Sequence, residues 1–162
     1  MMIVPSDRSL ERLGQRTARR ILHQKKRQKG RFAAPSIIAL VGPLGAGKTT
    51  FLRGFARGLG IRRRVVSPTF LLARRYRIPH RFEIRDSRFE IYPRWFWHLD
   101  VYRLHGHKDL AGLDFSEILV DPANIVAIEW AEKVKKALPK RTTWITFRHH
   151  SKGRIVHFRK PR

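Results

Sequence analysis

The stretch VGPLGAGKTT, residues 41–50, decides the fold of this chain. The phosphate-loop pattern G-x-x-x-x-G-K-[ST] is met by Gly42, Gly47, Lys48 and Thr49. Residues 44–49 must turn their backbone N–H groups inward to form a concavity for anions, and the small residues at 45–47 leave room for it. The sequence therefore predicts a site for nucleotide phosphates.

The segments on either side of this loop have the patterns that such a site requires. SIIALV, residues 36–41, is a short apolar run that ends at a glycine, which is typical of a buried parallel strand. From residue 48, apolar side chains recur at helical spacing, at Phe51, Leu52, Phe55 and Leu59. A helix that begins there directs its positive N-terminal end at the bound phosphates.

Each residue type in the loop has a chemical role. The expected phosphate cradle is formed by Gly42, Leu44, Gly45, Ala46, Gly47, Lys48, Thr49 and Thr50. Lys48 reaches the outer phosphates as a mobile positive charge, and the Thr49 hydroxyl can ligate Mg²⁺. We therefore expect a nucleoside triphosphate and Mg²⁺ as cofactors.

The metal also needs an acidic residue from a neighbouring strand. Two carboxylates stand at the ends of apolar runs, Asp100 in WFWHLD and Glu129 in NIVAIE. Glu129 closes the cleaner buried run and is favoured as the metal ligand, which leaves Asp100 to orient the attacking water or a metal-bound water. The residues by themselves do not decide which acid takes which role.

The remaining elements are predicted from periodicity and turn residues. We expect a helix over 6–29 capped by Ser6, a strand over 62–78 interrupted at Ser67-Pro68, and a hairpin in RFEI-RDS-RFEI, residues 81–91. Further along, we expect strands that lead to Asp100 and Glu129, a helix over 109–119 and a hairpin that turns at 151–153. The length of 162 residues favours one domain over 1–162, with 81–97 as an inserted hairpin.

The composition is strongly basic. Lys and Arg number 36 against 12 Asp and Glu, a formal net charge of +24, which favours a polyanionic partner such as nucleic acid. A solvated basic surface without a partner is the alternative. The chain has no cysteine, no apolar run of membrane-spanning length and no signal-peptide pattern at its start, so we expect a cytoplasmic location without membrane contact.

Four segments together resemble the bacterial TsaE family, also called YjeE: GPLGAGKTTFLRGFARGLGI, SPTF, HLDVYRL and IEWAEK. These small ATPases are needed to make threonylcarbamoyladenosine next to the tRNA anticodon. The resemblance implies an α/β fold, a P-loop NTPase-type three-layer sandwich with a mainly parallel central sheet. It also implies that ATP hydrolysis drives the cycle of a TsaD–TsaB pair, in which TsaD transfers the threonylcarbamoyl group. Contact with tRNA would come through that complex or directly through the basic surface.

The same resemblance implies roles for individual residues. Thr49 and Glu129 would contact Mg²⁺, and Asp100, with Lys48 and Glu129, would serve hydrolysis. The residues near the nucleotide, including a switch-like loop that senses the terminal phosphate, would be Ser67, Thr69, Trp130 and Glu132.

Two other functions remain open at the level of sequence. A P-loop kinase acting on RNA would need a phosphate acceptor, and a nucleic-acid-binding switch would bind ATP without hydrolysing it. A Ras-type GTPase is disfavoured because no N-K-x-D motif occurs. Aromatic residues interleaved with arginines around 89–97 could stack on unpaired bases or could cover the edge of the core.

Overall fold

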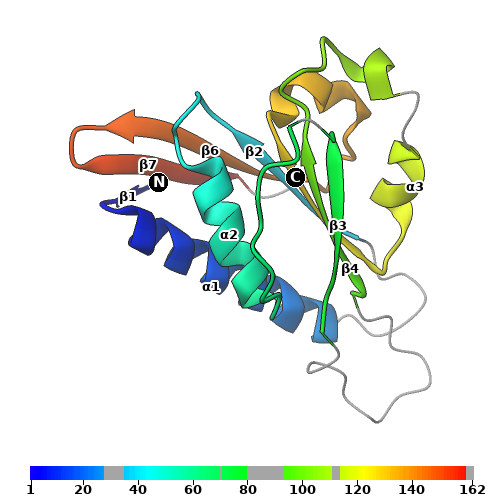
Figure 1. The fold of residues 1–162 in the computed structure, drawn as a ribbon, viewed down its shortest axis with the longest axis horizontal. Helices are drawn as coiled ribbons and strands as arrows, with labels where there is room; N and C mark the ends of the chain where they lie inside the picture. The colour runs from blue at the N-terminus through cyan, green and yellow to red at the C-terminus, as the bar shows by residue number, and fades with distance from the viewer. Residues whose placement is uncertain (28–34, 70, 80–92, 111–113, 160–162) are drawn as a thin grey trace.

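The computed structural model describes residues 1–27, 35–69, 71–79, 93–110 and 114–159 (Figure 1). It has three α-helices, α1 (Asp7–Arg27), α2 (Lys48–Gly58) and α3 (Phe115–Val120), within these ranges. Two 3-10 helices, η2 (His107–Leu110) and η3 (Ala131–Ala137), accompany them. No helix in the described ranges is both long and apolar enough to cross a membrane.

Seven strands form one mixed sheet in the order β1-β7-β6-β2-β5-β4-β3. The four central strands, β6 (Thr143–His150), β2 (Ser36–Val41), β5 (Asn124–Glu129) and β4 (Trp95–Asp100), run parallel. The edges are antiparallel and are formed by β1 (Met2–Val4), β7 (Gly153–Arg159) and β3 (Ala73–Arg77). The expected α/β sandwich with a parallel centre is therefore confirmed, and its two edges are antiparallel.

Each face of the sheet has its own core. In β2, Ile38 and Leu40 point toward α1 and α2, whereas Ile37 and Ala39 point toward the opposite layer, which contains α3 and η3. This alternation follows from the two-residue period of a strand, and burial of both faces explains why β2 and β5 are apolar throughout. Figure 1 shows α1 and α2 on one side of the sheet and α3 on the other.

The two long helices touch at their backbones. A Cβ atom added at Gly54 of α2 would lie 2.0 Å from the backbone oxygen of Glu11 in α1, and one at Gly14 would lie 2.2 Å from the backbone oxygen of Phe51. Only glycine permits this approach, which fixes the position of α2, and hence of the phosphate loop before it, relative to α1.

Two local predictions were wrong in extent, and two elements were missed. Only the second half of the expected strand over 62–78 forms, as β3, because residues 61–69 run as an irregular loop. Within the range 109–119, where one helix was expected, η2 ends at Leu110 and α3 begins at Phe115, and residues 111–113 lie outside the described ranges. The sequence patterns also missed β1, which has three residues, and the 3-10 helix η3.

Other predictions were confirmed where they can be compared. The hydroxyl of Ser6 accepts a hydrogen bond from the backbone N–H of Ser9 at 3.2 Å, as expected for the start of α1. The terminal hairpin β6–β7 turns at 151–152. The expected hairpin at 81–91 lies outside the described residues. The wider insert predicted over 81–97 extends too far, because residues 95–97 belong to β4, which begins at Trp95.

Candidate functional site

The phosphate loop lies between the carboxyl end of β2 and the first residue of α2. Its three glycines, Gly42, Gly45 and Gly47, have φ angles of 146°, 73° and 96°, which side-chain-bearing residues rarely adopt. At Gly42 a Cβ atom would also lie 2.3 Å from the backbone oxygen of Phe147 in β6. The glycines at these positions are therefore required by the backbone path of the loop itself.

The Lys48 side chain crosses this loop. Its Nζ donates hydrogen bonds to the backbone oxygens of Gly42, at 2.6 Å, and Pro43, at 2.9 Å, and lies 3.7 Å from the ring centroid of Trp130. Burial lowers the pKa of Lys48, and the negative charges of Glu129, Glu132 and Asp100 partly offset that effect. The ammonium group therefore lies between the first carbonyl oxygens of the phosphate loop and the Trp130 ring.

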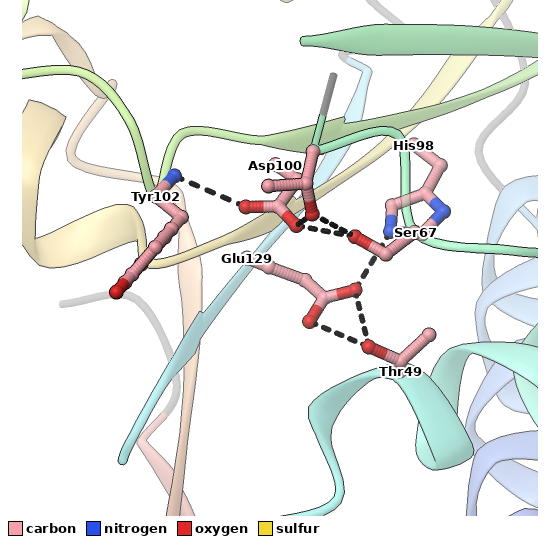
Figure 2. A network of polar contacts seen from close by, with 7 residues as sticks. Thr49, Ser67, His98, Asp100, Tyr102 and Glu129 are labelled. Atoms are coloured by element: carbon pink, nitrogen blue, oxygen red, sulfur yellow. Dashed lines mark hydrogen bonds and ion pairs between the residues drawn. The ribbon is translucent and has the colours of Figure 1, made fainter. Parts of the chain in front are cut away.

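Thr49 and Glu129 meet beside the loop (Figure 2). The Thr49 hydroxyl lies 3.0 Å from Oε1 and 2.9 Å from Oε2 of Glu129, whose side chain is almost fully buried at the end of β5. A hydroxyl and a carboxylate are hard oxygen donors of the kind that Mg²⁺ prefers, and Mg²⁺ commonly takes only one or two protein ligands besides water and phosphates. The pair fits a magnesium ion, and the described residues contain no group of three or more His, Asp or Glu that could hold a metal by itself.

His98 supports Glu129 from β4. Its Nε2 lies 2.8 Å from Oε1 of Glu129, and the imidazole is completely buried. The register pairs His98 with Ala127 and Asp100 with Glu129, so the alternation of the strands turns His98 and both carboxylates to the face that α1 and α2 cover. His98 belongs to the motif HLDVYRL, from which no contact with Glu129 was predicted; its position two residues before Asp100 in an apolar strand was the available signal.

Asp100 is held by a different set of donors. Its Oδ2 accepts hydrogen bonds from the hydroxyls of Ser67 and of Thr69, the latter at 2.5 Å, and its Oδ1 accepts one from the backbone N–H of Tyr102 at 3.0 Å. The hydroxyl oxygens of Ser67 and Thr69 also lie 2.7 Å apart. Ser67 and Thr69 therefore attach the irregular loop at 61–69 to the carboxylate of Asp100. Figure 2 shows the contacts of Asp100 with Ser67 and with Tyr102.

Aromatic and acidic residues after β5 border the site. Trp130 has a left-handed backbone conformation with φ of 60°, and its ring lies 4.9 Å from that of Tyr102. Lys133 secures the turn after Asp100, because its Nζ donates to the backbone oxygens of Tyr102, at 2.5 Å, and Leu104, at 2.9 Å. Glu132 is an exposed residue, but partial burial of its carboxyl group raises its pKa, against smaller opposing effects that include the charge of Lys48.

Most of the residues singled out in the sequence lie together at one end of the sheet. Thr49, Glu129 and Asp100 converge with the loop residues Ser67 and Thr69, and Trp130 covers Lys48. Leu44 contributes backbone only, since its side chain is 78% exposed and its carbonyl oxygen lies 3.2 Å from His149 Nε2. The contact of Lys133 with the turn after β4 was not foreseen, and a lysine in a polar stretch gives no signal of it.

The aromatic cluster before Asp100 belongs mainly to the core. Phe96 is fully buried between Phe55 and Tyr76, and Trp97 packs against the core on the other face. The guanidinium of Arg75 lies 4.2 Å from the ring centroid of Trp95. The core-edge interpretation is thus confirmed for Phe96 and Trp97, whereas Trp95 contacts arginine, and Phe89 and Tyr92 lie outside the described residues.

Comparisons with known proteins agree with this geometry. Residues 4–156 match the family described as threonylcarbamoyl adenosine biosynthesis protein TsaE. A tRNA threonylcarbamoyladenosine biosynthesis protein TsaE from Bacillus subtilis is 36% identical over 72% of this chain and 65% of its own length. A protein of the same description from Treponema pallidum is also 36% identical, over 70% of this chain and 73% of its own length.

A solved structure matches the fold over nearly the whole chain. The crystal structure of YdiB from Bacillus subtilis has a TM-score of 0.65 at 25% identity and covers 97% of this chain and 82% of that one. The alignment with the Bacillus subtilis TsaE sequence spans slightly less than two thirds of that relative. From the family match and these relatives, the chain belongs to the TsaE family of tRNA threonylcarbamoyladenosine biosynthesis proteins.

Proposed function

We propose that this chain is a magnesium-dependent ATPase whose hydrolysis of ATP drives a TsaD–TsaB-type threonylcarbamoyl transferase through its cycle on tRNA. The observation that carries the proposal is the pairing of two acids at neighbouring strand ends. Glu129 is bonded to the hydroxyl of the phosphate-loop residue Thr49, while Asp100 is bonded to a separate loop through Ser67 and Thr69.

The residues of the site divide the work of hydrolysis. The loop N–H groups, the N-terminal end of α2 and the Lys48 ammonium bind and orient the phosphates. Thr49 and Glu129 would hold Mg²⁺, which supplies charge neutralisation on the outer phosphates when it is bound. Asp100, fixed by three donors, is oriented to accept a hydrogen bond from a water and to position it for attack.

The switch-like character of the loop at 61–69 follows from how it is attached. Ser67 and Thr69 are joined to Asp100 by short polar contacts rather than by strand pairing. A change at Asp100 during hydrolysis would alter these contacts and hence the surface of the loop. The proposed partners, a TsaD-like and a TsaB-like protein, would read that change.

Phosphate release tests the proposal most directly. The full chain should hydrolyse ATP weakly alone and faster with the TsaD-like and TsaB-like proteins of its own organism, and co-purification with ATP should recover both partners. Lys48→Ala should abolish release in either setting. Labelled phosphate transferred to an RNA or a small acceptor would instead indicate a kinase, and ATP binding without hydrolysis under every condition would indicate a nucleotide switch.

A further inference from the structure

The outer face of α1 is a continuous row of arginines. Five residues of this helix, Arg8, Arg12, Arg16, Arg19 and Arg20, are exposed. At 3.6 residues per turn they lie within an arc of roughly 120° and extend over about 18 Å of the helix. We refer to these five residues as the arginine row.

No carboxylate neutralises the arginine row. The helix carries two acids, and both are bonded to residues outside it: Glu11 pairs with Arg57 of α2, and Asp7 pairs with Arg154 of β7 at 2.9 Å. Among the described residues, none of the five guanidinium groups has a hydrogen-bond or ion-pair partner. Five like charges held on a rigid helix therefore repel one another with no internal compensation.

The surface is also hollowed where the charges are densest. A shallow pocket on this face is lined by Ser9, Arg12, Gln15, Arg16 and Arg19, so that hydroxyl and amide groups lie among the guanidiniums. Guanidinium groups bind phosphate oxygens in a bidentate manner, and Ser and Gln side chains also bond to the backbone of nucleic acids. The chemistry of the pocket is that of a phosphate-binding surface.

We infer that the arginine row binds the phosphate backbone of RNA. One strand of double-stranded DNA presents a phosphate about every 3.4 Å of its axis, and by that measure the length of the row faces about five phosphates. The choice of RNA among polyanions rests on the proposed function in tRNA modification.

Other occupants fit the surface less well. A membrane-surface helix needs an exposed apolar face, whereas the apolar residues of α1 are turned inward and the exposed positions over residues 7–25 are all polar or charged. An interface with an acidic protein would be expected to contain aromatic or aliphatic anchors, and the exposed positions of α1 hold none.

The row also begins next to the phosphate loop. A side chain at Gly47 would collide with Leu10 of α1, so the first turn of the helix touches the loop. RNA bound along the row would therefore end beside the nucleotide site, although its binding does not require hydrolysis.

Direct binding in the absence of nucleotide tests the inference. A fluorescent hairpin RNA with the sequence of an anticodon stem-loop is titrated with the full chain between 50 and 300 mM KCl. The variant Arg12→Glu/Arg16→Glu/Arg19→Glu should bind at least about tenfold more weakly, and the slope of log affinity against log salt should fall by about 2 to 3. The Arg→Gln version of the same triple variant should reduce the slope similarly and guards against charge-induced misfolding.

The matched control changes the same charge elsewhere. Lys135→Glu/Lys136→Glu/Lys140→Glu alters three exposed lysines of the opposite layer and should retain affinity within about threefold. Equal losses in both triple variants, or no loss in the arginine variant, would overturn the inference. Binding to vesicles that contain anionic phospholipid but not to the RNA would assign the row to a membrane instead.

ATP hydrolysis measured in parallel separates the two proposals. The arginine variant should retain the basal phosphate release of the unmodified chain, and Lys48→Ala should retain RNA binding. The arginine variant could lose RNA binding while no protein, the unmodified chain included, releases phosphate. That result would contradict the proposed function and leave the row as a phosphate-binding surface.

Discussion

Two carboxylates at the same end of the sheet have nearly opposite surroundings. Glu129 and Asp100 end adjacent parallel strands, pair in register and are both buried. Glu129 is bonded to Thr49, in the first turn of a helix, and to the buried His98, so its neighbours belong to regular elements. Asp100 is bonded to Ser67 and to Thr69, which lie in an irregular loop.

This difference separates a carboxylate held by regular elements from one held by a loop. A metal ligand benefits from being held in place by surrounding groups. A residue that orients water at the terminal phosphate must respond as that phosphate leaves, and loop donors permit such a response. We therefore expect the two acids to fail differently when they are changed.

The largest effect is expected for Glu129→Ala. Removing the carboxylate deletes the proposed metal ligand, so turnover should be abolished and the affinity for ATP in the presence of Mg²⁺ should fall by about 100-fold. Calorimetric titration with and without EDTA measures this. The unmodified chain in EDTA should bind ATP about as weakly as the variant, whereas a variant that keeps its Mg²⁺-dependent affinity would assign the metal to Asp100.

Asp100→Asn should lose turnover but keep binding. The amide preserves the shape of the side chain but cannot act as a base, so phosphate release should fall by about 10² to 10⁴-fold. The affinity for ATP with Mg²⁺ should stay within about threefold, because the metal pair is untouched. A parallel loss of affinity would mean that the two acids share one role, despite their different surroundings.

His98 provides a smaller test of the fixed carboxylate. His98→Phe fills the buried space but leaves Glu129 without its β4 partner, and the affinity for Mg²⁺ should fall by about tenfold. His98→Gln can still donate to Oε1 and should recover most of the loss. Equal effects in the two variants would indicate that the imidazole serves packing alone.

The smallest effect concerns the alkaline limit of ATP binding, measured in EDTA. The Lys48 ammonium must be protonated to attract phosphates. Because burial lowers the pKa of Lys48 below its ordinary 10.5, affinity should fall with rising pH nearer to neutrality than for an exposed lysine. Lys48→Arg should flatten the profile, since a guanidinium stays protonated throughout.

The same pH profile compares the two acids. The charge of Glu129 raises the pKa of Lys48 more than that of Asp100 does. Glu129→Gln should therefore move the alkaline limit to lower pH further than Asp100→Asn does. The reverse order would contradict the stronger effect of Glu129 on the pKa of Lys48.

Much of this site was predictable from sequence because its parts are encoded locally. The phosphate loop, its strand and its helix follow one another without interruption, and the two acids mark the ends of apolar runs. The contacts of His98 with Glu129 and of Lys133 with the turn after β4 join residues about 30 positions apart, and they depend on strand register, which a single sequence does not reveal.

The loop at 61–69 shows the opposite limit. Its residues Val65 and Val66 favour a strand locally, yet Ser67 and Thr69 bond to Asp100 instead. Just before β3, Leu72 takes a left-handed conformation with φ of 60°. Tertiary polar contacts override local preference here, as they do at sites where function constrains the backbone.

The glycine contacts between α1 and α2 have a consequence for how the sequence can vary. Gly14 and Gly54 lie outside the phosphate loop, where α1 and α2 touch, yet an alanine at either position must push the two backbones apart. Since α2 begins at Lys48, that displacement is transmitted to the phosphate loop. A deep mutational scan should find that these two positions tolerate substitution as poorly as the phosphate loop itself. The geometry of the loop would then depend in part on two residues that lie outside it.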